Sequence, residues 1–144
     1  MNSITSKNIQ LEIVSPEKCV YQEKIDYVVL PAFNGEYAVL PGHTHFLCQL
    51  IEGELRIVQG ENINYFAVSG GFAVVHPDRI DVFAETAEMA KEINSERARL
   101  AADRAKQEIH QAASPQDLSV AQAALRRALI RLHVAENRSH RTKH

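Results

Sequence analysis

The sequence has no glycine after Gly71 and no aromatic residue after Phe83, although the chain runs to 144 residues. Its remainder is rich in Ala, Arg and Glu, with Leu at intervals. Aromatic, β-branched and glycine residues favour strands and tight turns, whereas Ala, Leu, Arg and Glu favour helices. This absence argues against a sheet that continues to the C-terminus. It predicts a β domain over residues 1–87 and a helical arm over residues 88–144.

Long apolar runs, paired cysteines and a strong net charge are also missing. The longest apolar runs, such as 27–33, are far too short for a membrane span, and residues 1–7 lack the apolar core of a signal peptide. Cys19 and Cys48 form no CxxC pattern, so we expect a cytosolic protein with two reduced thiols. A net charge of −2 argues against a dedicated nucleic-acid-binding protein.

The charge is divided unevenly between the two parts. Residues 1–87 carry five Lys/Arg and eleven Asp/Glu, a net of −6, whereas residues 88–144 carry eleven Lys/Arg and seven Asp/Glu, a net of +4. The basic arm therefore points to an acidic partner surface or to an anion.

The first part alternates apolar and polar residues in short runs. Ile9, Leu11 and Ile13 share one face, for example, and turn residues separate such runs about every ten positions. One of the predicted turns is Ser69-Gly70-Gly71. The pattern is typical of antiparallel strands in a sandwich or barrel. No βαβ alternation is present and no Lys-Ser/Thr follows the Gly pair, which argues against a parallel nucleotide-binding fold.

The arm shows two helices. The second has an apolar seam spaced 3-4-3-4-3, with Ser114 as N-cap, Pro115 at the first position and Asp117 three residues after the cap. The first runs from about residue 94 to 113, and the short link predicts an antiparallel hairpin with a disordered tail from about residue 138. The seams are Leu118, Ala121, Leu125, Ala128, Leu132 and Ala135, facing Ala98, Ala101, Ala105, Ile109 and Ala112.

These seams consist mostly of alanine. Large side chains expected to be well buried are Ile93, Ile109, Leu118, Leu125 and Leu132. At roughly 1.5–3 kcal/mol each, these side chains together contribute about 10 kcal/mol. Ordering the arm costs a similar free energy in conformational entropy, once helix formation has offset part of that cost. We therefore expect the arm to need a docking surface and to be able to exchange between surfaces.

Two groups of residues are candidate sites. His43 and His45 form an HxH pair that begins the metal site of cupin enzymes, but Gln49 stands where that pattern has Glu, and the pattern's second half is missing. Arg127 and Arg131 share one helical face, and an antiparallel hairpin brings Arg97 to the same end. Three such guanidinium groups could bind phosphates, although the spacing alone favours an ordinary solvated face. A nucleophile paired with a base is not evident.

Four motifs resemble the ATP synthase epsilon subunit, in order, over about residues 8–137. Residues 35–43, Gly-Glu-Tyr-Ala-Val-Leu-Pro-Gly-His, resemble that family's GxxGVLPGH loop, and residues 66–72, Phe-Ala-Val-Ser-Gly-Gly-Phe, its second signature. Residues 81–87 resemble its last strand, and Arg127-Ala128 with Arg131-Leu132 its C-terminal helix. Ala38 departs from the family glycine, which suggests that this backbone position does not need a positive φ.

The resemblance implies a β + α fold, an antiparallel flattened β-sandwich of about ten strands followed by a two-helix hairpin. It implies a non-catalytic rotor subunit of the F1 sector, at the cytoplasmic face of a bacterial inner membrane. Its partners would be the gamma subunit, the c-ring, and the α and β catalytic subunits, with no nucleic acid and no direct membrane contact. Glu36 and His43 match the family residues that contact the c-ring loop.

In bacterial members the hairpin either folds onto the sandwich or extends beside gamma, and the extended form inhibits ATP hydrolysis. By this resemblance Arg126, Arg127 and Arg131 would contact the catalytic subunits. Some members bind regulatory ATP through an I/L-D-x-x-R-A motif and arginines of the second helix. The matching residues are Ile93, Asn94, Arg97, Ala98, Arg127 and Arg131. Asn94 keeps the N-cap but loses the charge of Asp, so we expect weak ATP binding and no required cofactor. Besides the cupin-like enzyme, a free-standing ATP-sensing module is the other alternative.

Overall fold

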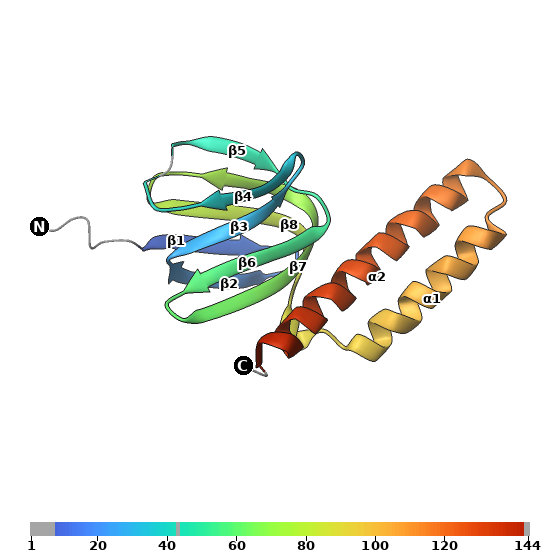
Figure 1. The fold of residues 1–144 in the computed structure, drawn as a ribbon. Coiled ribbons are helices and arrows are strands. Elements are labelled where there is room, and N and C mark those ends of the chain that lie inside the picture. Colours follow the sequence, from blue (N-terminus) through green and yellow to red (C-terminus); the bar gives the residue numbers. More distant parts are fainter. Residues whose placement is uncertain (1–7, 43, 143–144) are drawn as a thin grey trace, which may run out of the picture. The chain divides into compact units, whose positions relative to one another are not determined.

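A computed structural model describes residues 8–42 and 44–142. The chain divides into two compact units, Met1–Glu88 and Met89–His144. The first is built from strands and the second from helices (Figure 1).

The described part of the first unit contains eight strands. They are β1 (Ile9–Val14), β2 (Cys19–Ile25), β3 (Tyr27–Ala32), β4 (Gly35–Val39), β5 (Phe46–Gln49), β6 (Gly53–Gln59), β7 (Asn62–Val75) and β8 (Arg79–Met89). Hydrogen bonds connect them in the order β2-β1-β8-β7-β6-β3-β4, and β5 pairs with β7. The path curls back on itself, because the amide of Asp26 after β2 donates to the carbonyl of Val58 in β6 at 2.9 Å.

The sheet differs from the expected one in two respects. One neighbouring pair, β1 and β8, is parallel, whereas the sandwich was expected to be antiparallel throughout. The two strands lie at opposite ends of the unit's sequence, so no hairpin fixes their relative direction. The described strands also number eight rather than about ten. One strand fewer results because β7 does not end at the predicted Ser69-Gly70-Gly71 turn.

Strand β7 bends at its two glycines and continues. Gly70 and Gly71 have φ of 69° and 104°, values that favour glycine. Residues before the bend pair with β6, as in Val68 with Gly53, and residues after it pair with β5, as in Phe72 with Gln49. On this side a single strand therefore pairs first with β6 and then with β5, while it also neighbours β8, and the double glycine is its bend.

The sandwich core consists of large apolar side chains. The predicted face of Ile9, Leu11 and Ile13 is buried, and each of these side chains is at most 1% exposed. Phe66 in β7 is fully buried and packs edge-on against Tyr21, with ring centroids 5.6 Å apart. Strand β3 is buried on both faces, as expected for a strand between β4 and β6.

The second unit is a helical hairpin. A short 3-10 turn, η2 (Ala90–Glu92), is followed by α1 (Ser95–Gln111) and α2 (Pro115–Thr142), and the two helices pack against each other. The predicted caps are confirmed. The Asn94 side chain accepts from the Arg97 amide at 2.9 Å, and Ser114 Oγ accepts from the Asp117 amide at 3.0 Å. Helix α2 continues to Thr142, past the tail predicted from about residue 138, since no Gly or Pro ends it.

The seam of the hairpin contains fewer large side chains than expected. The face of α1 is Ala98, Ala102 and Ala105, whereas the predicted Ala101 is exposed, because a face that begins at Ala98 can continue at i+3 or at i+4 and the spacing does not choose between them. Ile93 is buried as predicted. The other large side chains of the seam are only half-buried: Ile109, Leu118, Leu125 and Leu132. Val134, which was not predicted, is fully buried. Neither helix has, over its described residues, the length and apolar character needed to cross a membrane.

Candidate functional site

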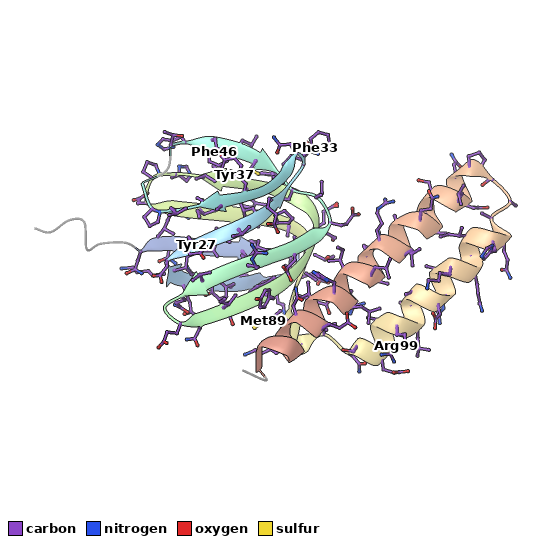
Figure 2. All side chains as sticks on the ribbon, viewed as in Figure 1. Tyr27, Phe33, Tyr37, Phe46, Met89 and Arg99 are labelled. Atoms are coloured by element: carbon purple, nitrogen blue, oxygen red, sulfur yellow. The ribbon has the colours of Figure 1, made fainter. Side chains whose placement is uncertain are left out.

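The first candidate site is the edge of the sandwich formed by β4 and the start of β5. Strand β4 ends the hydrogen-bonded path and is exposed over residues 35–38. Its neighbours are exposed apolar residues, with Phe33 74%, Leu40 51% and Leu47 69% exposed. The Tyr37 and Phe46 rings lie 4.9 Å apart, and both are seen near Phe33 at this edge in Figure 2. An exposed strand edge lined with aromatic side chains is suited to protein contact.

Glu36 projects from the opposite face of β4 to Tyr37, because side chains alternate along a strand. Its carboxylate accepts from Arg56 Nη1 at 3.3 Å, and its side chain stays 60% exposed. Arg56 in β6 also lies 3.5 Å from Glu54. Strand β3 lies between β4 and β6, so its register with both strands brings Glu36 and Arg56 together. Arg56 could not be predicted as a partner of Glu36, because 20 residues separate the two in the sequence.

His43, the other residue of this motif, lies outside the described residues. The turn beside it is fixed by the Gly42 amide, which donates to the Pro77 carbonyl at 2.8 Å. Ala38 lies inside β4 opposite Val29, and every described residue with positive φ is a glycine. The inference that this position does not need a positive φ is thus confirmed.

The second and third motifs are packing motifs. A Cβ added to Gly71 would come within 2.0 Å of the Phe83 carbonyl oxygen, so only glycine lets β7 approach β8 so closely. The Phe72 and Phe83 rings lie 5.3 Å apart. Ser69 and Thr86 share a hydrogen bond of 2.5 Å between their hydroxyl groups. These residues join β7 to β8.

The predicted nucleotide motif begins at the start of α1. Ile93 and Ala98 are buried in the hairpin unit, and Asn94 is engaged as the N-cap. Each of the three therefore has a structural role in the hairpin. The side chain of Arg97 is exposed.

Three arginines of α2 belong to the predicted sites. Arg126 and Arg127 are exposed, and Arg131 is half-buried. Arg97 lies 14 residues before the end of α1, while Arg127 and Arg131 lie 12 and 16 residues after the start of α2. At a rise of 1.5 Å per residue these positions are about 21, 18 and 24 Å from the closed end of the hairpin. The antiparallel fold thus brings the three arginines within about one turn of each other along its axis.

Cysteine and histidine are the residues to consider for covalent or metal chemistry. Burial raises the pKa of the Cys48 thiol, so it stays protonated and unreactive near neutral pH. Within residues 8–42 and 44–142, no three His, Cys, Asp or Glu side chains are arranged to hold a metal ion. His45 contacts His76.

Comparison with known proteins shows the relationship directly. The family model described as ATP synthase delta/epsilon chain, beta-sandwich domain, matches residues 8–90, and the long alpha-helix domain of the same chain matches residues 91–136. This chain belongs to the ATP synthase delta/epsilon chain family. The resemblance seen in the sequence is therefore confirmed, and the cupin-like alternative is not supported.

Curated relatives match over nearly their whole length. The ATP synthase epsilon chain of Nitratidesulfovibrio vulgaris is 46% identical over 131 residues, which cover 91% of this chain and 98% of the relative. That of Syntrophobacter fumaroxidans is 44% identical with the same coverage.

Solved structures agree on the fold. A chain of the Euglena gracilis mitochondrial ATP synthase, in a structure of OSCP, F1 and c-ring, superposes with a TM-score of 0.74 and 25% identity, covering 83% of this chain and 76% of that one. A chain of the Tetrahymena thermophila mitochondrial ATP synthase central stalk and c-ring superposes with a TM-score of 0.60 at 12% identity, covering 88% and 96%.

Proposed function

We propose that this chain is a non-catalytic central-stalk subunit of a bacterial F-type ATP synthase, peripheral at the cytoplasmic face of the membrane. The observation that carries the proposal is the order of the two family domains, which together span residues 8–136. Structural neighbours from F1/c-ring and central-stalk complexes support gamma and c-ring as its partners. The subunit couples their rotation and takes no part in the chemistry.

The proposed contact with the c-ring centres on Glu36. Its carboxylate is exposed and held by Arg56, so the charge is presented in a fixed position. The exposed apolar side chains of Phe33, Tyr37 and Leu47 belong to the same edge of the sandwich and would bury surface on a protein partner. His43 belongs to the same proposed contact.

A test is ATP-driven proton pumping by the reconstituted synthase carrying Glu36→Gln. We expect weaker pumping per ATP hydrolysed, because the contact loses its charge. Glu61→Gln is the matched control, since Glu61 is also an exposed acid and lies in the turn between β6 and β7. Equal coupling in both variants would remove Glu36 from the contact.

The hairpin is proposed to inhibit ATP hydrolysis by docking on the catalytic subunits through Arg126, Arg127 and Arg131. Truncation after Glu88 is expected to speed hydrolysis by the assembled enzyme. Replacing the three arginines with alanine is expected to do the same, whereas Arg104→Ala on α1 should not. Because the docking is electrostatic, inhibition should also weaken as salt rises. Unchanged hydrolysis by the truncated enzyme would rule out this role and leave the coupling role standing.

Weak regulatory ATP binding is proposed at the open end of the hairpin, through Arg97, Arg127 and Arg131. Calorimetry on the isolated chain should show ATP heats that Arg131→Ala abolishes. Asn94→Asp keeps the cap and restores the charge, and we expect it to tighten binding by about fivefold, the difference between a neutral and a charge-assisted hydrogen bond. Equal heats for the parent and Arg131→Ala would exclude the site.

A further inference from the structure

Two histidines that the proposed function does not use face each other at one end of the sandwich. Nδ1 of His45 lies 3.2 Å from Nδ1 of His76, and the ring centroids are 5.1 Å apart with the planes nearly perpendicular. We infer that these two nitrogens form a chelating site for a divalent transition-metal ion that favours imidazole, such as Zn²⁺.

The pairing of two strands brings the two rings together without a ligand. Strands β5 and β7 are antiparallel, with Phe46 opposite Val75. His45 precedes Phe46 and His76 follows Val75, so the register puts the two histidines opposite each other at the end of the ladder. The His76 amide donates to the Arg79 carbonyl at 2.8 Å, which closes the turn after it.

The separation of the nitrogens fits a shared metal ion. Two nitrogens, each 2.0–2.1 Å from a tetrahedral zinc ion, stand about 3.3 Å apart. Without metal, one ring must donate its Nδ1 proton to the other, so the same geometry also suits a neutral hydrogen-bonded pair. Either nitrogen of a neutral imidazole can carry the proton, and binding needs both Nδ1 atoms to be free of it.

Asp81 favours the tautomer of His76 that binds metal. Its Oδ2 lies 3.9 Å from Nε2 of His76, on the side of the ring away from His45. A carboxylate there favours a proton on Nε2 and leaves the Nδ1 lone pair directed at His45, the arrangement typical of histidine ligands with an outer carboxylate. The other oxygen of Asp81 accepts from Arg79 at 2.6 Å, and Arg79 also lies 3.7 Å from Glu12, which fixes the carboxylate.

The site takes two ligands from the described residues, in which no group of three is arranged to hold a metal ion. Water would complete the coordination. The ligand pair differs from the HxH pair of a cupin, and we assign no reaction to it. A bound ion would instead link β5 to the β7–β8 turn.

The test is Zn²⁺ titration of the full chain, made without an affinity tag and freed of metal by a chelator, with competition against a chromophoric chelator. We expect one equivalent to bind. His45→Gln and His76→Gln should each weaken the binding at least tenfold, and His110→Gln, an exposed histidine of α1, should leave it unchanged. Identical binding in all four proteins, or no binding by the parent, would overturn the inference.

A second measurement separates binding from a change in folding. In nitrogen-15 spectra of the imidazole rings, Zn²⁺ should shift Nδ1 of His45 and of His76 together in the parent protein. Asp81→Asn should weaken affinity by about tenfold, as outer carboxylates typically do, while Arg79→Gln should change it less. Ring nitrogens that do not shift would contradict the site even if some zinc were retained elsewhere.

Discussion

The sandwich and the hairpin bury side chains of very different size. Among the described residues, the fully buried side chains of the sandwich include Phe66, Ile9, Leu11 and Ile57, whereas those buried in the hairpin unit are six alanines together with Ile93 and Val134. Burial of a Leu, Ile or Phe side chain contributes about 1.5–3 kcal/mol, and a single methyl group contributes much less. The sandwich is therefore stabilised by its own core, whereas the stability of the hairpin depends more on helix formation and on the surface that it docks against.

The largest effect of a single substitution on stability is expected at Phe66. Phe66→Ala should lower the free energy of unfolding of the sandwich by about 3–5 kcal/mol, because it removes a fully buried ring and leaves a cavity. Val134→Ala in the hairpin should cost about 2 kcal/mol or less. Urea unfolding followed by tyrosine fluorescence reports the sandwich, which holds every tyrosine of the chain, and helical circular dichroism reports the hairpin. A Val134→Ala effect as large as that of Phe66→Ala would contradict the account.

The bend of β7 is the next most sensitive point. Gly71→Ala should destabilise the sandwich by about 3 kcal/mol, because its Cβ would collide with the Phe83 carbonyl and φ is positive there. The control is Gly60→Ala, where φ is also positive but nothing lies within 4 Å, and where about 1 kcal/mol is expected. Thermal unfolding of the two variants should differ accordingly. Equal losses would show that strain in φ, and not the close approach of β7 to β8, fixes this glycine.

In the hairpin, the caps should matter as much as its buried side chains. Asn94→Ala and Ser114→Ala each remove a side chain that accepts from a backbone amide at a helix start, and each should cost about 1 kcal/mol. Helical circular dichroism during urea unfolding measures the loss. Asn94→Asp and Ser114→Asp should restore stability, since Asp caps equally well. Loss of helix in those two variants would contradict the assignment of the caps.

The smallest effect is expected at the surface pair of Arg56 and Glu36. Arg56→Gln should change the free energy of unfolding by less than about 1 kcal/mol, because exposed ion pairs contribute little. It should nevertheless reduce coupling in the assembled enzyme, since Glu36 loses the partner that positions it. Proton pumping and urea unfolding, both measured on this variant, separate the effect on coupling from the effect on stability. A large loss of stability would show that the pair has a structural role.

Local features of the sequence predicted the hairpin well. The caps Asn94 and Ser114 act on amides three residues away, so their role can be derived without knowledge of the fold. The choice of Ala101 over Ala102 was wrong because i+3 and i+4 both lie on the helix face that begins at Ala98, so the spacing alone does not separate them.

Features that depend on distant residues could not be predicted in this way. The double glycine of β7 gives the same local signal whether it ends a strand or bends one, and only the partners β5 and β6 decide between them. The parallel pairing of β1 with β8, the Arg56 partner of Glu36 and the contact of His45 with His76 likewise depend on strand register over tens of residues. The family resemblance supplied Glu36 and His43, which composition alone would not have selected.

Native-state hydrogen exchange on the isolated chain tests the central contrast most directly. Amides of β1 and β7, such as those of Leu11 and Phe66, should exchange only through global unfolding. Amides of α1 and α2 should open at a free energy about 3 kcal/mol lower, and so exchange roughly 100-fold faster. Equal opening free energies for the two units would contradict the account of a firmly packed sandwich bearing a weakly held hairpin.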